Sequence, residues 1–263
     1  MISTFLLGCK EKKVLKVVQE NQEAIIQKYA VKCAHKINYY VRMKDYQACL
    51  DAGLQKDSTI AYLWQQKGMP YFKIKKYEVG MEYVDKAVLY DRKRYLPYRA
   101  FLKCIFSKTY KDAIADFESC INEFGDNYEM DHSYSFYIGL SYLQLEQFEK
   151  AQEYFVKAEQ KALHDFGELH HTLWFYKGVV AMELQEYQKA IEAYSFAIAE
   201  YPQFSDAYYH KVFCMFKLEN EYTEEMKELL EKAAIYKSQG YSINEANALY
   251  EEYPYQVKEF RYQ

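Results

Sequence analysis

The chain has 263 residues, of which 50% are hydrophobic and 27% are charged, a composition typical of globular rather than disordered proteins. Its net charge of −4 gives no basic surplus to neutralise nucleic-acid phosphates, and no apolar run of about 18 residues is present to span a bilayer as a helix. With only 9 Gly and 4 Pro, it lacks the turn residues of an all-β protein, so long helices joined by short links are expected.

Residues 1–9 read MISTFLLGC and are followed by the charged run KEKK. The tetrad Leu6, Leu7, Gly8 and Cys9 resembles a bacterial lipobox, which implies a lipid on Cys9 and a place in the bacterial cell envelope. No Lys or Arg precedes the tetrad and the apolar stretch is short, two departures that a start codon assigned too far downstream explains. The alternative is an ordinary apolar end of a cytoplasmic protein.

Residues 10–57 are predicted to form a diverged N-terminal helical hairpin. Its two helices are expected at Val14–Arg42, after a polar leader, and at Asp45–Leu54. Periodicity alone supports this hairpin, which would cap one end of the structure.

The cysteines fall into two pairs with equal spacing. Cys33 and Cys49 are 16 residues apart (49 − 33), as are Cys104 and Cys120 (120 − 104), a spacing that can place both members on facing helices of one hairpin. The favoured interpretation is that all four are small, unpaired core residues, because free cysteine is among the most buried residue types. No C-x-x-C pair is present, so a thiolate metal site is not expected.

A repeated pattern runs through the middle of the chain and is clearest from Trp174 to Pro202. Small residues alternate there with large rings at positions where two helices would cross, and a proline ends the second helix. The marked residues are Trp174, Gly178, Ala181, Tyr187, Ala190, Tyr194, Ala197 and Pro202. This pattern resembles the tetratricopeptide repeat, and the resemblance implies an all-α, right-handed α-solenoid of stacked helical hairpins.

The array is predicted to cover residues 58–238 as about five repeats. They lie near 61–92, 94–126, 132–165, 171–204 and 205–238. The repeat at 94–126 is degenerate, with its first helix about one residue out of register.

Three local features of the array and its end lead to further expectations. Gly139 and Gly178 are 39 residues apart (178 − 139), five more than the family's length of about 34, so a longer link is expected near residues 161–169. Pro70 is expected to kink or break its helix. Residues 239–263 are predicted to form a capping helix, at Asn244–Tyr253, and a tail.

The family resemblance implies a peptide site on the concave wall, which the first helices line. Carried over by repeat register, this candidate groove is an apolar and aromatic stripe. Its residues are Tyr62, Gln65, Met69, Phe72, Phe136, Leu140, Leu143, Phe175, Val179, Met182, Tyr209, Phe213 and Phe216. Such a groove suits a hydrophobic helix face or an extended segment with bulky anchors. The alternative is that neighbouring hairpins or the chain's own N-terminal helix cover these residues.

No enzyme is expected, and no cofactor, metal or catalytic residue is assigned. We therefore expect a scaffold that binds an unidentified protein or peptide partner, does not bind nucleic acid, and meets a membrane only through a lipid on Cys9. Two alternatives stay open. One is a cytoplasmic adaptor of the same fold; the other is a metal-dependent or hydrolytic protein that uses His164, Glu168 and His171, which stand at helical i, i+4 and i+7.

Overall fold

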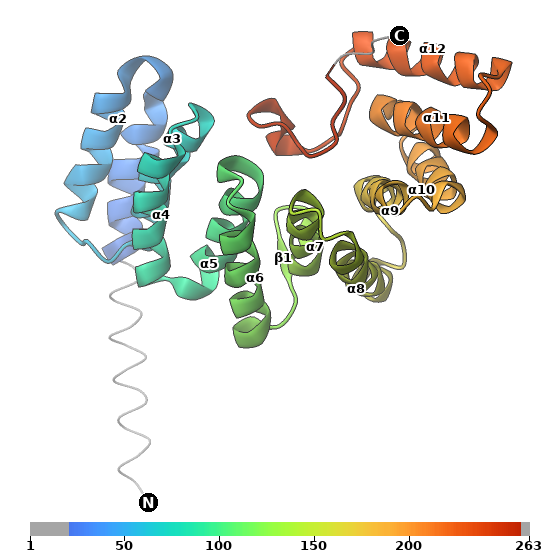
Figure 1. The fold of residues 1–263 in the computed structure, drawn as a ribbon. Helices are drawn as coiled ribbons and strands as arrows, with labels where there is room; N and C mark the ends of the chain where they lie inside the picture. The colour runs from blue at the N-terminus through green and yellow to red at the C-terminus, as the bar shows by residue number, and fades with distance from the viewer. Residues whose placement is uncertain (1–20, 259–263) are drawn as a thin grey trace, which may run out of the picture. The chain divides into compact units, whose positions relative to one another are not determined.

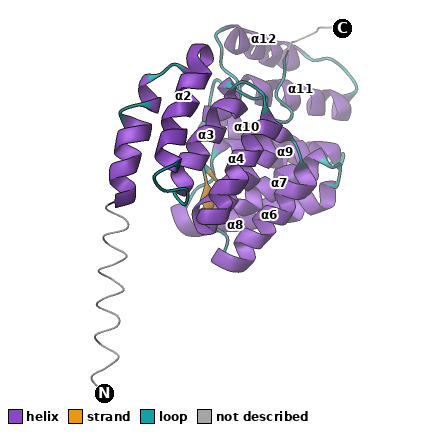
Figure 2. Cartoon of the chain, turned by 90° about the vertical axis from the view of Figure 1, so that its left-hand side faces the viewer, coloured by secondary structure: helices purple, strands orange, loops and turns teal. Residues whose placement is uncertain are grey.

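The computed structural model describes residues 21–258, and almost all regular structure in that range is helical (Figures 1 and 2). The chain divides into two compact units, whose described parts are residues 21–99 and 100–258. Within the described residues, no helix is both long and apolar enough to cross a membrane. Cys9 and the predicted lipobox lie outside the described range.

Unit 1 consists of helices that pair in chain order. Residues 21–26 are helical and lead into a π-helix; the elements that follow are the π-helix Gln27–Val31, the 3-10 helix Ala34–Lys36, α2 (Tyr39–Leu54), α3 (Ala61–Lys73) and α4 (Tyr77–Tyr90). The sequence predicts one helix that ends at Arg42 and a second that begins at Asp45. The structure instead has one helix, α2, through both residues. The chain does depart from helical geometry at Arg42, with φ −126° and ψ 50°.

Cys33 and Cys49 form a disulfide, with their Cα atoms 5.8 Å apart. The favoured interpretation of unpaired core cysteines is therefore wrong for this pair, and the spacing itself was the better guide. The disulfide joins Cys33, directly before the 3-10 helix Ala34–Lys36, to the buried residue Cys49 of α2. Cys104 and Cys120 remain buried thiols, as the favoured interpretation expected.

Pro70 does not break its helix, because α3 continues to Lys73. A proline cannot donate to the carbonyl four residues earlier, which here belongs to Gln66. That carbonyl instead accepts a hydrogen bond from the hydroxyl of Tyr46, at 3.3 Å. A tertiary contact thus satisfies the group that Pro70 leaves open.

Unit 2 contains the hairpins that carry the clearest repeat pattern. The helix α5 (Arg92–Leu102) leads into it. The elements that follow are the π-helix Lys103–Ser107, α6 (Tyr110–Phe124), β1 (Tyr128–Glu129), β2 (His132–Ser133), α7 (Tyr134–Gln144), α8 (Phe148–Phe166), α9 (His171–Glu183), α10 (Tyr187–Glu200), α11 (Ser205–Glu219) and α12 (Glu224–Ser238). Consecutive helices from α6 to α12 pack on one another, which is the stacking that the repeats predict.

The π-helix Lys103–Ser107 accounts for the degenerate repeat. A π-turn takes one more residue than an α-turn, so it absorbs a one-residue insertion without ending the helix. The first helix of this repeat was predicted to be one residue out of register. The wider turn accommodates that residue and ends at Lys108, which adopts a left-handed φ of 57°.

The five surplus residues between Gly139 and Gly178 do not form the longer link that we expected. The helix α8 has 19 residues, whereas its counterpart α10 has 14, a difference of five (19 − 14). The surplus therefore extends a helix. Gly167 ends α8 in a left-handed conformation with φ 77°, which glycine adopts without steric cost.

Two short strands, β1 and β2, depart from the all-α expectation. They pair antiparallel, with Tyr128 opposite Ser133 and Glu129 opposite His132 (orange in Figure 2). Met130, in the turn between them, has a left-handed φ of 50°. The result is a tight hairpin between α6 and α7.

The C-terminal segment, residues 239–258, is called the tail from here on. The helix expected at Asn244–Tyr253 is wrong, because only Ala246–Leu249 form a short 3-10 helix. Gly240, with φ 87°, turns the chain away from α12. Figure 1 shows the tail, in dark red, returning along the inner side of the curve that α6–α12 form within unit 2.

Close helix crossings occur where the repeat pattern places small residues. A Cβ atom added to Gly178 would lie 2.7 Å from Cε1 of Tyr194, a ring that is completely buried. A Cβ added to Gly139 would lie 3.1 Å from Cδ1 of Phe155. Glycine is therefore required at the first crossing and strongly favoured at the second.

Substitution Gly178→Ala should lower the free energy of unfolding by about 1–3 kcal/mol, the usual cost of overpacking a filled core. Gly139→Ala is the matched control and should cost less, because its added methyl meets Phe155 at a longer distance. Urea unfolding followed by circular dichroism measures both. Equal stability of the Gly178→Ala variant and the parent would contradict the assigned crossing.

Reduction of the Cys33–Cys49 disulfide should destabilise α2 by about 3 kcal/mol, the chain-entropy value for a closed loop of about 15 residues. Native-state hydrogen exchange of the α2 amides, with and without reductant, measures the loss. The double variant Cys33→Ser, Cys49→Ser is the control and should show no response to reductant. Unchanged exchange in the parent chain would show that the two cysteines are not joined in solution.

Candidate functional site

Three side chains stand at equivalent positions on the inner side of unit 2. They are Tyr137 in α7, Tyr176 in α9 and His210 in α11. Each lies two residues before the position that the repeat pattern gives to glycine, here Gly139, Gly178 and Val212. The repeat therefore sets their alignment.

Two of these side chains hold the backbone of the tail. The hydroxyl of Tyr176 donates to the carbonyl oxygen of Pro254 at 3.0 Å, and Nε2 of His210 donates to that of Tyr255 at 2.9 Å. Burial raises the pKa of Tyr176 well above its ordinary value, so its hydroxyl keeps the proton that it donates. A carbonyl can only accept, so the proton of neutral His210 lies on Nε2.

Further contacts fix the tail from both sides. The hydroxyl of Tyr255 donates to Oε1 of Glu183 at 2.6 Å, and Nζ of Lys108 donates to the carbonyl oxygen of Glu252 at 2.7 Å. Asp206, which is completely buried, accepts from the Val257 amide at 2.6 Å. Unit 2 therefore holds the tail, which turns at residues 254–255, mainly by its main chain.

The structure buries several residues of the candidate groove. Those buried in the hairpins of unit 2 are Phe136, Leu140, Leu143, Phe175 and Val179, and Phe72 is buried in unit 1. Those partly exposed are Tyr62, Gln65, Met69, Met182 and Tyr209, and those exposed are Phe213 and Phe216.

The candidate groove residue Phe175 comes directly before Tyr176, which contacts the tail. Phe136 packs on Phe155, with ring centroids 5.7 Å apart, and Phe175 packs on Phe204, at 4.9 Å. These rings are inside the helix layers, whereas the next residues, Tyr137 and Tyr176, are directed to the inner side. The groove of the sequence analysis stays a prediction. Three residues that each follow one of its members, Tyr176, Glu183 and His210, make hydrogen bonds with the tail.

A second group of polar side chains converges where the tail passes the β-hairpin. Nε2 of His132 donates to Oε1 of Glu245 at 2.8 Å, and both side chains are buried. One ligand atom from each of His132, Glu245 and His170 lies within 4.8 Å of the other two. We call these three residues the histidine cluster.

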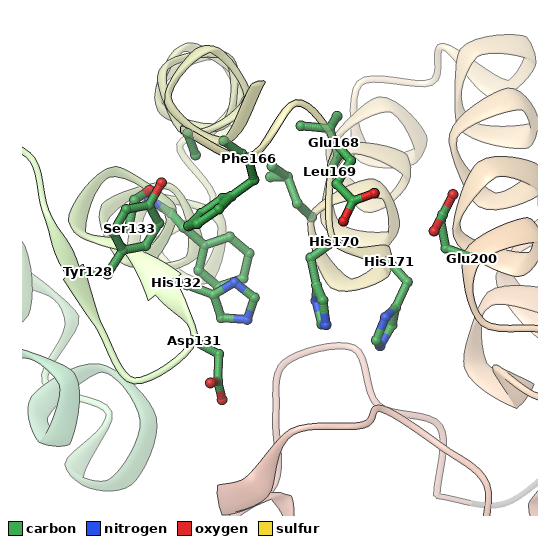
Figure 3. A pocket seen from close by; sticks show the side chains of 14 residues that line it. Tyr128, Asp131, His132, Ser133, Phe166, Glu168, Leu169, His170, His171 and Glu200 are labelled. Carbon is green, nitrogen blue, oxygen red and sulfur yellow. The ribbon is translucent and has the colours of Figure 1, made fainter. Parts of the chain in front are cut away.

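The cluster lies beside a cavity of about 480 Å³, part of whose lining is His132, His170, His171, Asp131 and Glu168. Figure 3 shows the rings of His132, His170 and His171 near one another, with the faint red ribbon of the tail passing beneath them.

Each member of the cluster is positioned by a different element. His132 belongs to β2, and its ring stacks on Phe136 with centroids 3.9 Å apart. His170 is the N-cap of α9, where its Nδ1 accepts a long hydrogen bond of 3.4 Å from the Thr172 amide. Glu245 belongs to the tail.

The electrostatics of the cluster keep Glu245 ionised and the two linker histidines neutral. Burial alone would raise the pKa of Glu245, but the charge and hydrogen bond of His132 hold it below its ordinary value. Burial, followed by the neighbouring histidine, lowers the pKa of His170, and it lowers that of His171 to about 4. The cluster therefore combines an anionic oxygen on Glu245 with a His170 imidazole that keeps a lone pair at neutral pH.

The structure does not bring together His164, Glu168 and His171 in the predicted way. Their spacing requires one continuous helix, but α8 ends at Phe166 and α9 begins at His171. His164 is exposed and pairs with Asp165 at 2.7 Å. Sequence reasoning missed the actual cluster because His132 and Glu245 are 113 residues apart.

Comparisons with known proteins agree with this architecture. The family model for the tetratricopeptide repeat matches residues 136–160, which span α7 and most of α8. No curated protein matches the chain in sequence.

Several solved structures share the fold at low sequence identity. A tetratricopeptide repeat protein from Parabacteroides merdae is 17% identical, with 86% of this chain and 94% of that one covered and a TM-score of 0.59. A double mutant of MamA from strain RS-1 is 14% identical, covers 68% and 96%, and has a TM-score of 0.56. YrrB, described as a tetratricopeptide repeat protein with an unusual peptide-binding site, is 18% identical, covers 72% and 92%, and has a TM-score of 0.51.

The repeated small residues, the stacked hairpins and these solved structures lead to one conclusion: the described part of the chain has the fold of tetratricopeptide repeat proteins, and residues 136–160 match the family model of that repeat.

Proposed function

We propose that the chain is an interaction scaffold, and not an enzyme, whose inner side in unit 2 binds an extended peptide segment of a partner protein. The observation that carries the proposal is the end of the tail, residues 250–258, a segment without helix or strand that unit 2 holds by main-chain atoms. Its carbonyl oxygens at Pro254 and Tyr255 accept hydrogen bonds from Tyr176 and His210, which the repeats place in register.

The backbone of the tail supports this proposal. Tyr255 has a φ of 60°, in the left-handed region that costs a residue with a side chain roughly 1–2 kcal/mol. Contacts on both sides offset that cost: the Tyr255 hydroxyl binds Glu183, and its carbonyl binds His210. These contacts, which oppose the cost of the Tyr255 conformation, support the proposal that the surface binds a peptide segment.

The chemistry of the site defines the partner. Tyr253 of the tail is buried and supplies a bulky anchor, while the neighbouring contacts are made to main-chain atoms. The partner segment is therefore an extended peptide with an aromatic residue followed by a main chain free to accept hydrogen bonds. YrrB, with its described peptide-binding site, shares this fold and lends support by analogy.

The partner segment competes with the tail, so releasing the tail should expose the site. We expect a fluorescent peptide that copies residues 250–258 to bind the full chain carrying Tyr253→Ser and Tyr255→Ser at least about tenfold more tightly than it binds the parent. The reason is that loss of a buried aromatic side chain costs several kcal/mol of tail docking. Fluorescence anisotropy gives both affinities.

Two matched controls make this test specific. Leu249→Ser, at an exposed tail residue, should leave peptide binding at the parent level. Adding Tyr176→Phe and His210→Phe to the released variant should weaken binding about tenfold or more, because each hydrogen bond contributes roughly 1 kcal/mol. Binding that ignores these two groove substitutions, or no binding to a released variant of normal helix content, would overturn the proposal.

We also propose that the scaffold lies in the cell envelope, held by a lipid on Cys9. The Cys33–Cys49 disulfide supports this location, because disulfides persist in oxidising compartments and are rare in the cytosol. The lipobox-like tetrad that ends at Cys9 supplies the means of attachment.

The protein expressed from its native locus should partition into the detergent phase of a Triton X-114 extraction. Cys9→Ser should move it to the aqueous phase, because a covalent lipid provides the apolar surface that drives partition. Cys104→Ser, at a buried core thiol, is the control and should change nothing. Recovery of the parent wholly in the aqueous phase would remove the case for an anchor.

A further inference from the structure

We propose that His132, His170 and Glu245 bind one divalent transition-metal ion of the zinc type, which joins the tail to the β-hairpin and to the start of α9. The proposal does not depend on the peptide site. It rests on the convergence of three ligand atoms within 4.8 Å of one another, from segments far apart in the chain.

The donor set selects the class of metal. Two imidazole nitrogens and one carboxylate oxygen suit zinc and its neighbours, whereas magnesium and calcium prefer sites made of oxygen alone. Three protein ligands also leave one coordination position for water or a further side chain. The histidine cluster therefore resembles an open zinc site in its chemistry.

The geometry needs only small changes to accept the ion. Ligand atoms about 2.1 Å from a tetrahedral zinc lie about 3.4 Å from one another. Nε2 of His132 and Oε1 of Glu245 are already 2.8 Å apart, so they would separate slightly, and His170 would approach by about an ångström. Rotation about side-chain bonds supplies such movements.

Protons balance in a simple way. The ion takes the place of the proton that His132 Nε2 shares with Glu245 Oε1; in a singly protonated ring that proton moves to Nδ1, and in a doubly protonated ring it leaves to solvent, so a neutral imidazole coordinates through Nε2 in either case. His170 gives up, at most, the 3.4 Å hydrogen bond from the Thr172 amide, which is at the long limit for such a bond. Neither change disrupts the helices.

A neighbouring atom provides a second, independent observation. Nε2 of His171 is buried and has no hydrogen-bond partner, and the rings of His170 and His171 have centroids 3.9 Å apart. A buried polar atom without a partner is rare and calls for an explanation, of which a bound ion is one. His171 thus adds an imidazole nitrogen without a partner next to the three ligands, outside the group of atoms that lie within 4.8 Å of one another.

The test is a titration of the untagged full chain with zinc chloride, followed by isothermal calorimetry. We expect one ion per chain. His170→Gln should weaken binding at least about tenfold, since loss of a supporting partner alone costs that much. Glu245→Gln should do the same while it keeps an oxygen toward His132. Far-ultraviolet circular dichroism confirms that each variant is folded.

Two histidines outside the cluster provide matched controls. His164→Gln removes an exposed imidazole near the end of α8, and His35→Gln removes one from unit 1; neither should change zinc affinity. Cobalt(II) added in place of zinc should give the intense visible absorption of a tetrahedral site, and Glu245→Gln should weaken it.

Absence of stoichiometric zinc binding would overturn the proposal. The proposal would also be wrong if His164→Gln abolished zinc binding while His170→Gln and Glu245→Gln left it unchanged. The ion would then bind at the exposed end of α8. The readout is metal bound per chain, so either result leaves the peptide-site proposal untouched.

Discussion

The close crossing of the two helices in each hairpin is the constraint on which the rest of unit 2 depends. Gly178 allows the ring of Tyr194 to lie directly against α9, and Gly139 does the same for Phe155 against α7. This contact fixes the rotation of each first helix about its own axis. The residue two positions before each glycine consequently has the same orientation in its hairpin; the Tyr137 hydroxyl donates to the carbonyl of Glu129, and that of Tyr176 donates to the carbonyl of Pro254 in the tail.

Most of the fold could be predicted from the sequence because the repeat is a local signal. Small residues and rings recur at helical spacing, and each hairpin is specified within about 34 residues. The predictions of secondary structure were wrong where the spacing of the repeat residues fits two different structures. Residues 161–166 can extend a helix or form a link, and only the packed structure shows that α8 is extended. The π-helix at Lys103–Ser107 is the structural cause of a register shift that the sequence could reveal but not explain.

The candidate sites were less predictable, since they depend on contacts between distant segments. Ser242, Asn244 and Pro254 provide plausible signals for a terminal helix, yet Ser242 donates to Asp206 at 2.7 Å, and Tyr176 binds the Pro254 carbonyl. Tertiary hydrogen bonds override local propensity here. No periodic pattern links His132 to Glu245, so their pairing could not be inferred from the sequence.

The way in which unit 2 holds the tail has a consequence for how the sequence tolerates change. Tyr176, His210 and Lys108 all donate hydrogen bonds to main-chain carbonyl oxygens of the tail, and every amino acid has such an oxygen. Replacing the side chain of Glu252, Pro254 or Tyr255 therefore keeps the carbonyl oxygen that accepts each of these hydrogen bonds. Replacing Tyr176 or His210 removes a bond that nothing in the tail can restore, so these three bonds tolerate substitution in the tail better than substitution in the array.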